Sequence, residues 1–113
     1  MSFNRNYSAR CFYRVIFPGS SISGLEIPPE FLDHMKEEPS GVATLESVSS
    51  RRKWHVKLSK ESDVIVFKDG FERFYIDNSL NFNDVLLFRY HGNLKFKVQI
   101  FDQSGSRKDI IRE

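Results

Sequence analysis

The chain has 113 residues, a formal net charge of +2, and 40% hydrophobic residues, among them 11 Phe. This length fits one domain, the apolar content excludes an intrinsically disordered chain, and no apolar run reaches the roughly 18 to 20 residues of a membrane-spanning helix. Because the first ten residues lack the apolar stretch of a secretory signal and the single cysteine, Cys11, cannot close an internal disulfide, we expect an intracellular protein with Cys11 as a small buried side chain.

Short strands with turn residues between them are predicted in the first half of the chain. Residues 11–17 are aromatic and β-branched and stop at a Pro-Gly-Ser-Ser run. Pro29 stands at the start of a stretch with apolar residues at helical spacing, which predicts a short helix. The predicted elements are strands at 11–17, 25–27 and 42–48, a helix at 29–35 and a turn at 49–53.

The second half begins with a strand whose two faces differ. Trp54, Val56 and Leu58 alternate with polar residues, so Lys57 is displayed to solvent if the apolar set faces the core. Trp54 could stack on a nucleic-acid base, but its place in this alternation favours the core. A polar stretch at 59–63 is expected to separate this strand from the next.

Three more strands and a second helix complete the pattern. They are strands at 64–67, 85–90 and 95–101, a helix at 70–78 after an Asp-Gly turn, and a hairpin loop at 91–94. Seven short strands and two short helices predict a mainly β fold that is closed or nearly closed, since closure limits exposed strand edges. We expect polar segments at 1–10 and 102–113 around a folded unit at 11–101.

The charges are segregated along the chain although they nearly cancel in total. Residues 1–25 carry three arginines and no acid, whereas residues 26–48 carry six acids and one lysine. Residues 49–60 hold five basic residues and no acid, residues 61–84 are net negative, and residues 85–113 are net positive. Such segregation can produce one basic face for an anion or a nucleic acid, or only solvated surfaces.

No catalytic or metal-binding pattern stands out. Cys11, His34, His55 and His91 lie on separate predicted elements without metal-ligand spacing. The carboxylates cluster where solvated surface is expected, and no Gly-rich phosphate loop joins a strand to a helix. We therefore predict no enzyme activity, no metal, no cofactor and no small-molecule substrate.

Several motifs follow one another between residues 11 and 101. They are Phe12-Tyr13-Arg14-Val15-Ile16, Leu25-Glu26-Ile27-Pro28-Pro29-Glu30-Phe31, Lys53-Trp54-His55-Val56, Asp69-Gly70-Phe71-Glu72-Arg73-Phe74, Asn78-Ser79-Leu80, Asp84-Val85-Leu86-Leu87-Phe88 and Phe96-Lys97-Val98-Gln99-Ile100-Phe101. In this order the motifs resemble the B3 DNA-binding domain of plant transcription factors. They are most similar to the reproductive-meristem branch of that family.

The resemblance implies a seven-stranded open β-pseudobarrel with two short α-helices, which binds double-stranded DNA by placing two arms in the major groove. One arm corresponds to residues 14–21 and the other to residues 57–63. The arm residues suited to phosphate or base contacts are Arg14, Ser20, Ser21, Lys57, Ser59, Lys60 and Ser62. Arg51, Arg52 and Lys53 are expected to form a soluble turn with an auxiliary attraction to DNA.

Departures from the family pattern bear on the expected site. The first arm lacks the Ser-Asp pair of many members and reads Phe17-Pro18-Gly19-Ser20-Ser21-Ile22. Glu61 and Asp63 place acids in the second arm, where each would repel phosphate unless it turns away or accepts from a cytosine amine. Asn83 replaces a common Gly and also tolerates a left-handed turn, while Phe71 replaces a Trp as a core residue.

We therefore predict the DNA-binding module of a plant nuclear transcription regulator, with double-stranded DNA and other nuclear regulators as partners and no membrane association. The alternative is a β-barrel for protein interaction or for single-stranded nucleic acid, because small barrels host unrelated functions. Exposed aromatic side chains across a sheet face would favour single strands. A basic rim with buried aromatic side chains would favour duplex DNA.

Overall fold

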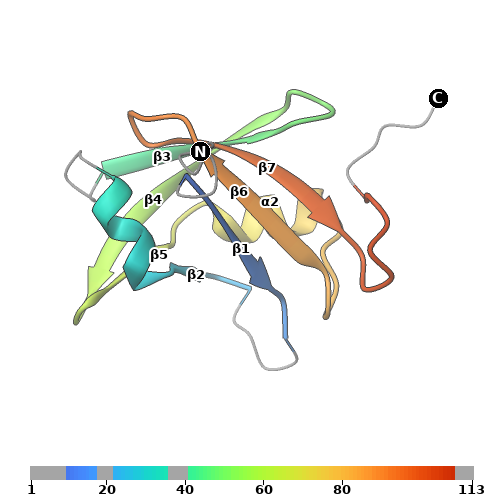
Figure 1. Cartoon of the computed structure of the whole chain (residues 1–113), viewed down its shortest axis with the longest axis horizontal. Coiled ribbons are helices and arrows are strands. Elements are labelled where there is room, and N and C mark those ends of the chain that lie inside the picture. The colour runs from blue at the N-terminus through green and yellow to red at the C-terminus, as the bar shows by residue number, and fades with distance from the viewer. Residues whose placement is uncertain (1–9, 18–21, 36–40, 109–113) are drawn as a thin grey trace, which may run out of the picture.

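The computed structural model describes residues 10–17, 22–35 and 41–108, which form one curled sheet with two short helices (Figure 1). Within these residues the elements are β1 Cys11–Val15, β2 Leu25–Ile27, η1 Pro29–His34, β3 Gly41–Ser47, β4 Lys53–Glu61, β5 Val64–Phe67, α2 Phe71–Asp77, β6 Val85–Tyr90 and β7 Lys95–Phe101. The predicted mainly β class, with its strands and helices, is confirmed. The first helix is a 3₁₀-helix rather than an α-helix, as is common for helical segments this short.

The seven strands form a single sheet in the order β1-β6-β7-β3-β4-β5-β2. Neighbouring strands are antiparallel except β3 and β7, which are parallel. The edges are therefore β1 and β2, and the sheet curls so that these edges approach each other (Figure 1). Because β1 and β2 do not pair with each other, the fold is an open half-barrel. Across the seam between them, Arg14 Nε donates a 2.8 Å hydrogen bond to the carbonyl oxygen of Glu26.

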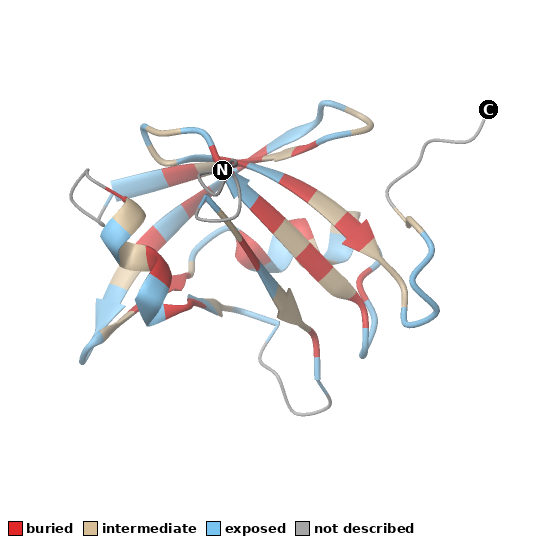
Figure 2. Ribbon diagram, viewed as in Figure 1, coloured by how far each residue is buried: buried red, intermediate tan, exposed pale blue. Residues whose placement is uncertain are grey.

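One face of each long strand is buried inside the half-barrel. On β4, Trp54, Val56 and Leu58 are buried while most of the residues between them are exposed, and Figure 2 shows this alternation along several strands. The centre of the core is aromatic, with the rings of Phe12 and Phe88 stacked at 4.8 Å. Because side chains alternate between faces, the polar residues of these strands lie on the outer face of the sheet.

Helix α2 packs on the core through Trp54. The Trp54 side chain is 7% exposed, its Nε1 donates a 2.9 Å hydrogen bond to Asp77 Oδ2, and its ring meets that of Phe74 edge-on at 5.1 Å. The helix follows Gly70, which has φ of 104° and where a Cβ would collide with the carbonyl oxygen of His55. The prediction that Trp54 belongs to the core is confirmed.

The β4–β5 hairpin is longer than the sequence predicts. The stretch 59–63 is predicted as a polar separator, but β4 continues to Glu61, which pairs with Val64. That prediction is wrong because the backbone ladder extends beyond the core, where side chains need not be apolar. Only Ser62 and Asp63 remain as the turn.

Predictions at three single positions have different outcomes. Asn83 has φ of 75°, which confirms the left-handed turn, and Phe71 is fully buried, which confirms a core residue. Cys11 was expected to be buried but is only partly buried, because it lies on the outer face of the edge strand β1. Neither helix in the described ranges is long and apolar enough to cross a membrane.

Residues 102–108, which the sequence suggests as the start of a polar tail, lie against the sheet. The backbone N–H of Lys108 donates a 2.7 Å hydrogen bond to the carbonyl oxygen of Ile100. The Lys108 Nζ lies 2.6 Å from Asp84 Oδ2, and the Asp84 side chain is only 4% exposed. The same carboxylate accepts a 2.8 Å hydrogen bond from the backbone of Asn81, so its buried charge is compensated.

Candidate nucleic-acid interface

The second predicted arm and the described part of the first, residues 14–17, lie at the same edge of the half-barrel. In Figure 1, β1 ends and β2 begins at the lower edge, and the β4–β5 hairpin ends at that edge too. Of the first arm, Ser20 and Ser21 lie outside the described residues. The curl of the sheet brings together segments that are far apart in the sequence.

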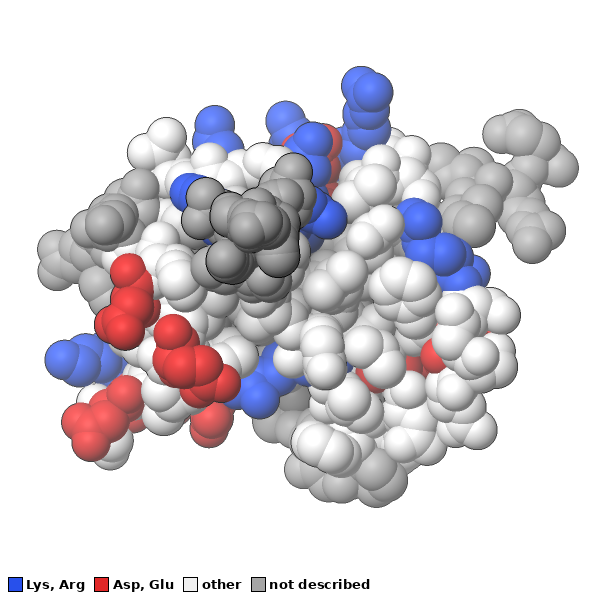
Figure 3. Space-filling model, viewed as in Figure 1, with Lys and Arg blue, Asp and Glu red and all other residues white. Residues whose placement is uncertain are grey.

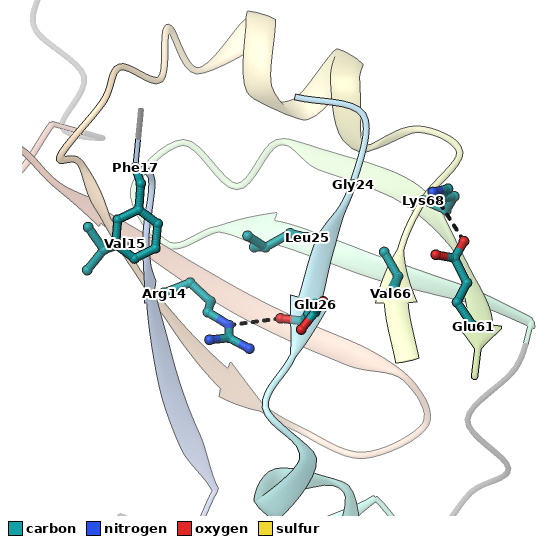
Figure 4. A pocket seen from close by; sticks show the side chains of 9 residues that line it. All are labelled: Arg14, Val15, Phe17, Gly24, Leu25, Glu26, Glu61, Val66 and Lys68. Atoms are coloured by element: carbon teal, nitrogen blue, oxygen red, sulfur yellow. Dashed lines mark hydrogen bonds and ion pairs between the residues drawn. The ribbon is translucent and has the colours of Figure 1, made fainter. Parts of the chain in front are cut away.

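Arg14, the first residue of the first arm, lies at the seam between β1 and β2. It shares a face of β1 with the buried Phe12 and Ile16, so its side chain turns into the opening of the half-barrel. Its Nε donates to the Glu26 carbonyl, and among the described residues no acceptor contacts its two terminal NH₂ groups. Figure 4 shows the guanidinium between β1 and β2, in a depression of about 390 Å³ that Phe17 also lines.

The acid of the second arm that borders this depression is paired within the protein. Glu61 Oε2 lies 3.2 Å from Lys68 Nζ, and Figure 4 shows both side chains on the wall of the depression. Pairing reduces the repulsion that Glu61 would exert on a phosphate. Sequence reasoning missed Lys68, although counting the register outward from the Ser62-Asp63 turn places residue 68 beside residue 57.

The hairpin carries its two lysines on opposite faces. Lys57 and Ser59 belong to the outer face of β4, whereas Lys60 belongs to the face that continues the core. Both lysines are exposed, and neither forms an ion pair with a carboxylate of the described residues. Ser62 occupies the turn at the tip with φ of 58°. The hairpin is thus a two-stranded ribbon with Lys57 on one side and Lys60 on the other.

The predicted auxiliary residues, Arg51-Arg52-Lys53, lie at the other end of β4. This strand has nine residues, so its first and last residues are about 26 Å apart. Arg52 Nη2 lies 3.4 Å from Asp77 Oδ2, and the Arg52 guanidinium lies 4.9 Å from the centre of the Trp54 ring. The hydrogen bond from Trp54 is the main cause that lowers the pKa of Asp77 below its ordinary value. Arg52 therefore supports the packing of α2, far from the arms.

Residues that could bind metals do not gather in the described part of the chain, where no three or more His, Cys, Asp and Glu side chains are placed to hold an ion. The His34 ring packs 5.4 Å from the Phe31 ring. The Nδ1 atom of His55 lies 3.5 Å from Thr44 Oγ1. These histidines have separate structural surroundings.

Comparison with known proteins places this chain in a family. The model of the B3 DNA binding domain matches residues 13–104. The B3 domain-containing protein Os11g0197600 of Oryza sativa subsp. japonica is 31% identical over 103 residues, which are 91% of this chain and 25% of that protein. The B3 domain-containing transcription factor VRN1 of Arabidopsis thaliana is 35% identical over 96 residues, which are 84% of this chain and 28% of that protein. The chain thus spans about a quarter of the length of these relatives.

Solved structures share the fold. The hypothetical Arabidopsis thaliana protein At1g16640.1 has a TM-score of 0.71 at 27% identity, over 81% of this chain and 89% of that chain. Arabidopsis FUS3, solved as a DNA complex, has a TM-score of 0.58 at 11% identity, over 79% of this chain and 93% of that chain. Since the family model covers most of the sequence and the half-barrel is the shared architecture, this chain belongs to the B3 DNA-binding domain family.

Proposed function

We propose that this chain is the DNA-binding module of a plant nuclear transcription regulator and that its two arms grip double-stranded DNA in the major groove. Membership of a DNA-binding family supports DNA as the ligand, and the relative VRN1 is named a transcription factor. Two structures with this fold, FUS3 and LEC2, are DNA complexes. The proposed contact residues are Arg14, Ser20, Ser21, Lys57, Ser59, Lys60 and Ser62.

The shape of the β4–β5 hairpin carries the proposal. A two-stranded ribbon fits the major groove, which is about 12 Å wide. With Lys57 on one face and Lys60 on the other, the ribbon offers one cation to each phosphate backbone that borders the groove. The terminal NH₂ groups of Arg14 can donate to O6 and N7 of a guanine. The hydroxyls of Ser59 and Ser62 supply further donors on the same ribbon.

The two acids of the second arm are compatible with this ligand. Glu61 is paired with Lys68 at 3.2 Å, so its charge is partly compensated before DNA arrives. Asp63 lies exposed at the turn, where its carboxylate can accept a hydrogen bond from the N4 amine of cytosine. An acid in that position favours some base pairs over others.

The placement of aromatic side chains supports duplex rather than single-stranded DNA. Single strands are held by bases stacked on several exposed rings. Most rings of the described residues are buried in the core, and the exposed ones are Tyr13, Phe17 and Phe82. Tyr13 lies on the edge strand β1 and Phe17 just follows it. Phe82 lies beside them, because the backbone N–H of its neighbour Asn83 donates a hydrogen bond to the carbonyl oxygen of Ile16. The three rings are therefore at one edge and not spread across a sheet face.

The proposal includes a non-catalytic role and location in the nucleus. It also includes other nuclear regulators as partners, because the relatives that carry this domain are several times longer than it. We also place the chain in the reproductive-meristem-like branch of the family, on the order and content of its motifs. A tree of B3 domains drawn from every branch tests that placement.

Titration of a labelled duplex, and of one of its strands alone, at several salt concentrations tests DNA binding. About four to six phosphate contacts predict a slope of log affinity against log salt near −4 to −5 for the duplex, at roughly −0.9 per contact. We expect weaker binding of the single strand. Arg73→Gln is the control, because Arg73 is an exposed residue of α2 away from the arms. Salt-independent binding, or none to duplex at low salt, would contradict the proposal.

A further inference from the structure

A second basic surface lies on the outer face of the sheet, at the end of β4 opposite the hairpin tip. Arg89 of β6, Lys97 of β7, Glu46 of β3 and Lys53 of β4 follow one another across four neighbouring strands, because the strand register pairs each with the next. Neighbouring strands are about 4.8 Å apart, so this row spans about 14 Å. The three cations are exposed, and Glu46 is partly buried between two of them.

A second row extends this surface toward the β6–β7 turn. Lys95 pairs with Thr44, and Thr44 pairs with His55 on the next strand. At the end of β6, the backbone N–H of Tyr90 donates a 2.8 Å hydrogen bond to the carbonyl oxygen of Arg10. The backbone N–H of His91 donates a 2.8 Å hydrogen bond to the carbonyl oxygen of Lys95. The backbone therefore fixes where these side chains emerge.

The two rows border a recess of about 290 Å³, lined by Lys53, His55, His91, Lys95 and Lys97 among others. Burial lowers the pKa of His91, and the nearby cations Lys97, Arg89 and Arg10 lower it further, while Glu46 acts in the opposite direction. Cations close enough to oppose a proton on His91 are close enough to attract an anion there.

The positive charge of this surface is largely uncompensated. Its five cations, Arg10, Lys53, Arg89, Lys95 and Lys97, face one carboxylate, that of Glu46, and none forms an ion pair with a carboxylate of the described residues. Figure 3 shows Lys and Arg side chains along the upper edge, where β3, β6 and β7 converge in Figure 1, and mainly Asp and Glu at the lower left, over η1 and the β4–β5 hairpin. The complementary ligand for such a row is a chain of phosphates.

We propose that this outer surface binds the phosphate backbone of a second DNA duplex, so that one chain joins two duplexes. A row of about 14 Å matches about four phosphates at the roughly 3.4 Å axial rise of one strand. The contact is independent of sequence, since contacts to phosphates carry no sequence information. Lys57 of the arm shares the outer face of β4 with Lys53 and lies about 13 Å from it, farther than the major groove is deep, about 8.5 Å, so a groove that holds the hairpin tip does not reach Lys53. The inference rests on the proposed function for the first duplex only.

The stoichiometry of the complex tests this inference. Sedimentation velocity at low salt, with an excess of a duplex about one helical turn long, should show two duplexes per wild-type chain. Lys95→Gln/Lys97→Gln should bind one duplex, with its affinity for that duplex within about twofold of wild type. Capture of a labelled duplex on an immobilised one should fall at least about tenfold in this variant. Lys57→Gln/Lys60→Gln is the matched control, since it loses the same charge from the arm and should keep the outer contact.

One duplex per wild-type chain, or two per Lys95→Gln/Lys97→Gln chain, would overturn the inference. Binding of a poly-glutamate peptide to this surface, at a salt concentration at which no second duplex binds, would also overturn it and indicate an acidic protein partner. Unchanged binding of the first duplex by Lys57→Gln/Lys60→Gln would instead contradict the proposed function. Thermal melting of both variants, expected to match wild type, confirms that each is folded.

Discussion

The second arm and the outer surface carry positive charge in different ways. In the arm, Lys57 and Lys60 are mixed with the acids Glu61 and Asp63, and one of these acids is paired with Lys68. The outer surface, of which only Lys53 belongs to β4, holds five cations and one carboxylate. A contact with DNA can thus depend mainly on the shape of a segment or mainly on its charge. The hairpin is suited to enter a groove by its shape, whereas the outer surface is suited to lie on a backbone by its charge.

The largest effect is expected from Trp54→Ala, because Trp54 packs on the core that positions both ends of β4. Truncation of a buried aromatic side chain should lower the free energy of unfolding by roughly 3 to 5 kcal/mol. Urea titration followed by circular dichroism measures this loss, and both DNA contacts should weaken together. A variant with unchanged stability and lost DNA binding would instead place Trp54 at the DNA surface.

Lys108→Ala should destabilise the fold without touching either DNA contact. It leaves the Asp84 carboxylate buried without its cation, which should cost about 2 to 3 kcal/mol, less than a fully buried pair because Lys108 is 20% exposed. Thermal melting measures the loss. Lys108→Ala/Asp84→Asn should recover part of the stability, and equal destabilisation by Lys97→Ala would mean that the Asp84 pair has no special role.

Single substitutions in the second arm and in the outer surface should separate the two contacts. Lys57→Gln should lower the salt slope for the first duplex by about one unit, and Lys97→Gln should do so for the second duplex only. Both variants should keep wild-type stability within about 0.5 kcal/mol, because the side chains are exposed. Equal effects of both variants on both duplexes would show diffuse attraction to net charge and would refute the distinction between the arm and the outer surface.

Glu61→Gln should strengthen binding at the hairpin end alone. It removes a negative charge from the arm and releases Lys68, so affinity for the first duplex should rise by about 0.5 to 1 kcal/mol, or roughly two- to fivefold. Fluorescence anisotropy at low salt measures the change. Glu72→Gln, an exposed acid of α2, is the control. A fall in affinity would indicate that Glu61 itself accepts a hydrogen bond from DNA.

The smallest effect is expected on stability at acidic pH, to which Asp77 of α2 contributes. The pKa of Asp77 is lowered in the folded state, chiefly by the hydrogen bond from Trp54, so its contribution is present above the ordinary value of 3.8 and is lost as pH falls through the lower folded value. Asp77→Asn should flatten the dependence of melting temperature on pH in that acidic window. An unchanged pH profile would show that Asp77 contributes nothing to acid stability.

Sequence patterns predicted single side chains well where a local rule applies. Trp54 lies in the core because it alternates with polar residues, and Asn83 adopts the left-handed turn that its short side chain tolerates. The extent of β4 was predicted poorly, because residues 59–61 lie beyond the core and lose the apolar half of the pattern. Ser20 and Ser21 stay predictions, since they lie outside the described residues.

The candidate site was predicted less completely than the fold. Arg14, Lys57 and Lys60 were assigned to arms on the family resemblance, but sequence patterns did not show that Lys57 and Lys60 occupy opposite faces of the hairpin. That depends on the register of β4 beyond the core. Arg51-Arg52-Lys53 and Lys57 share one basic block of sequence, yet Lys57 lies about 13 Å along β4 from Lys53, because each residue advances the chain by about 3.3 Å.

The mainly β class and the places of the strands and helices follow from the amino-acid sequence alone, because they depend on local periodicity and turn chemistry. Only the tertiary structure decided which distant residues meet. Arg14 reaches the Glu26 carbonyl, and Arg89 lies in a row with Lys97 and Lys53. The physical reason is that the order β1-β6-β7-β3-β4-β5-β2 arises from pairing between strands far apart in the chain, which no local pattern of residues specifies.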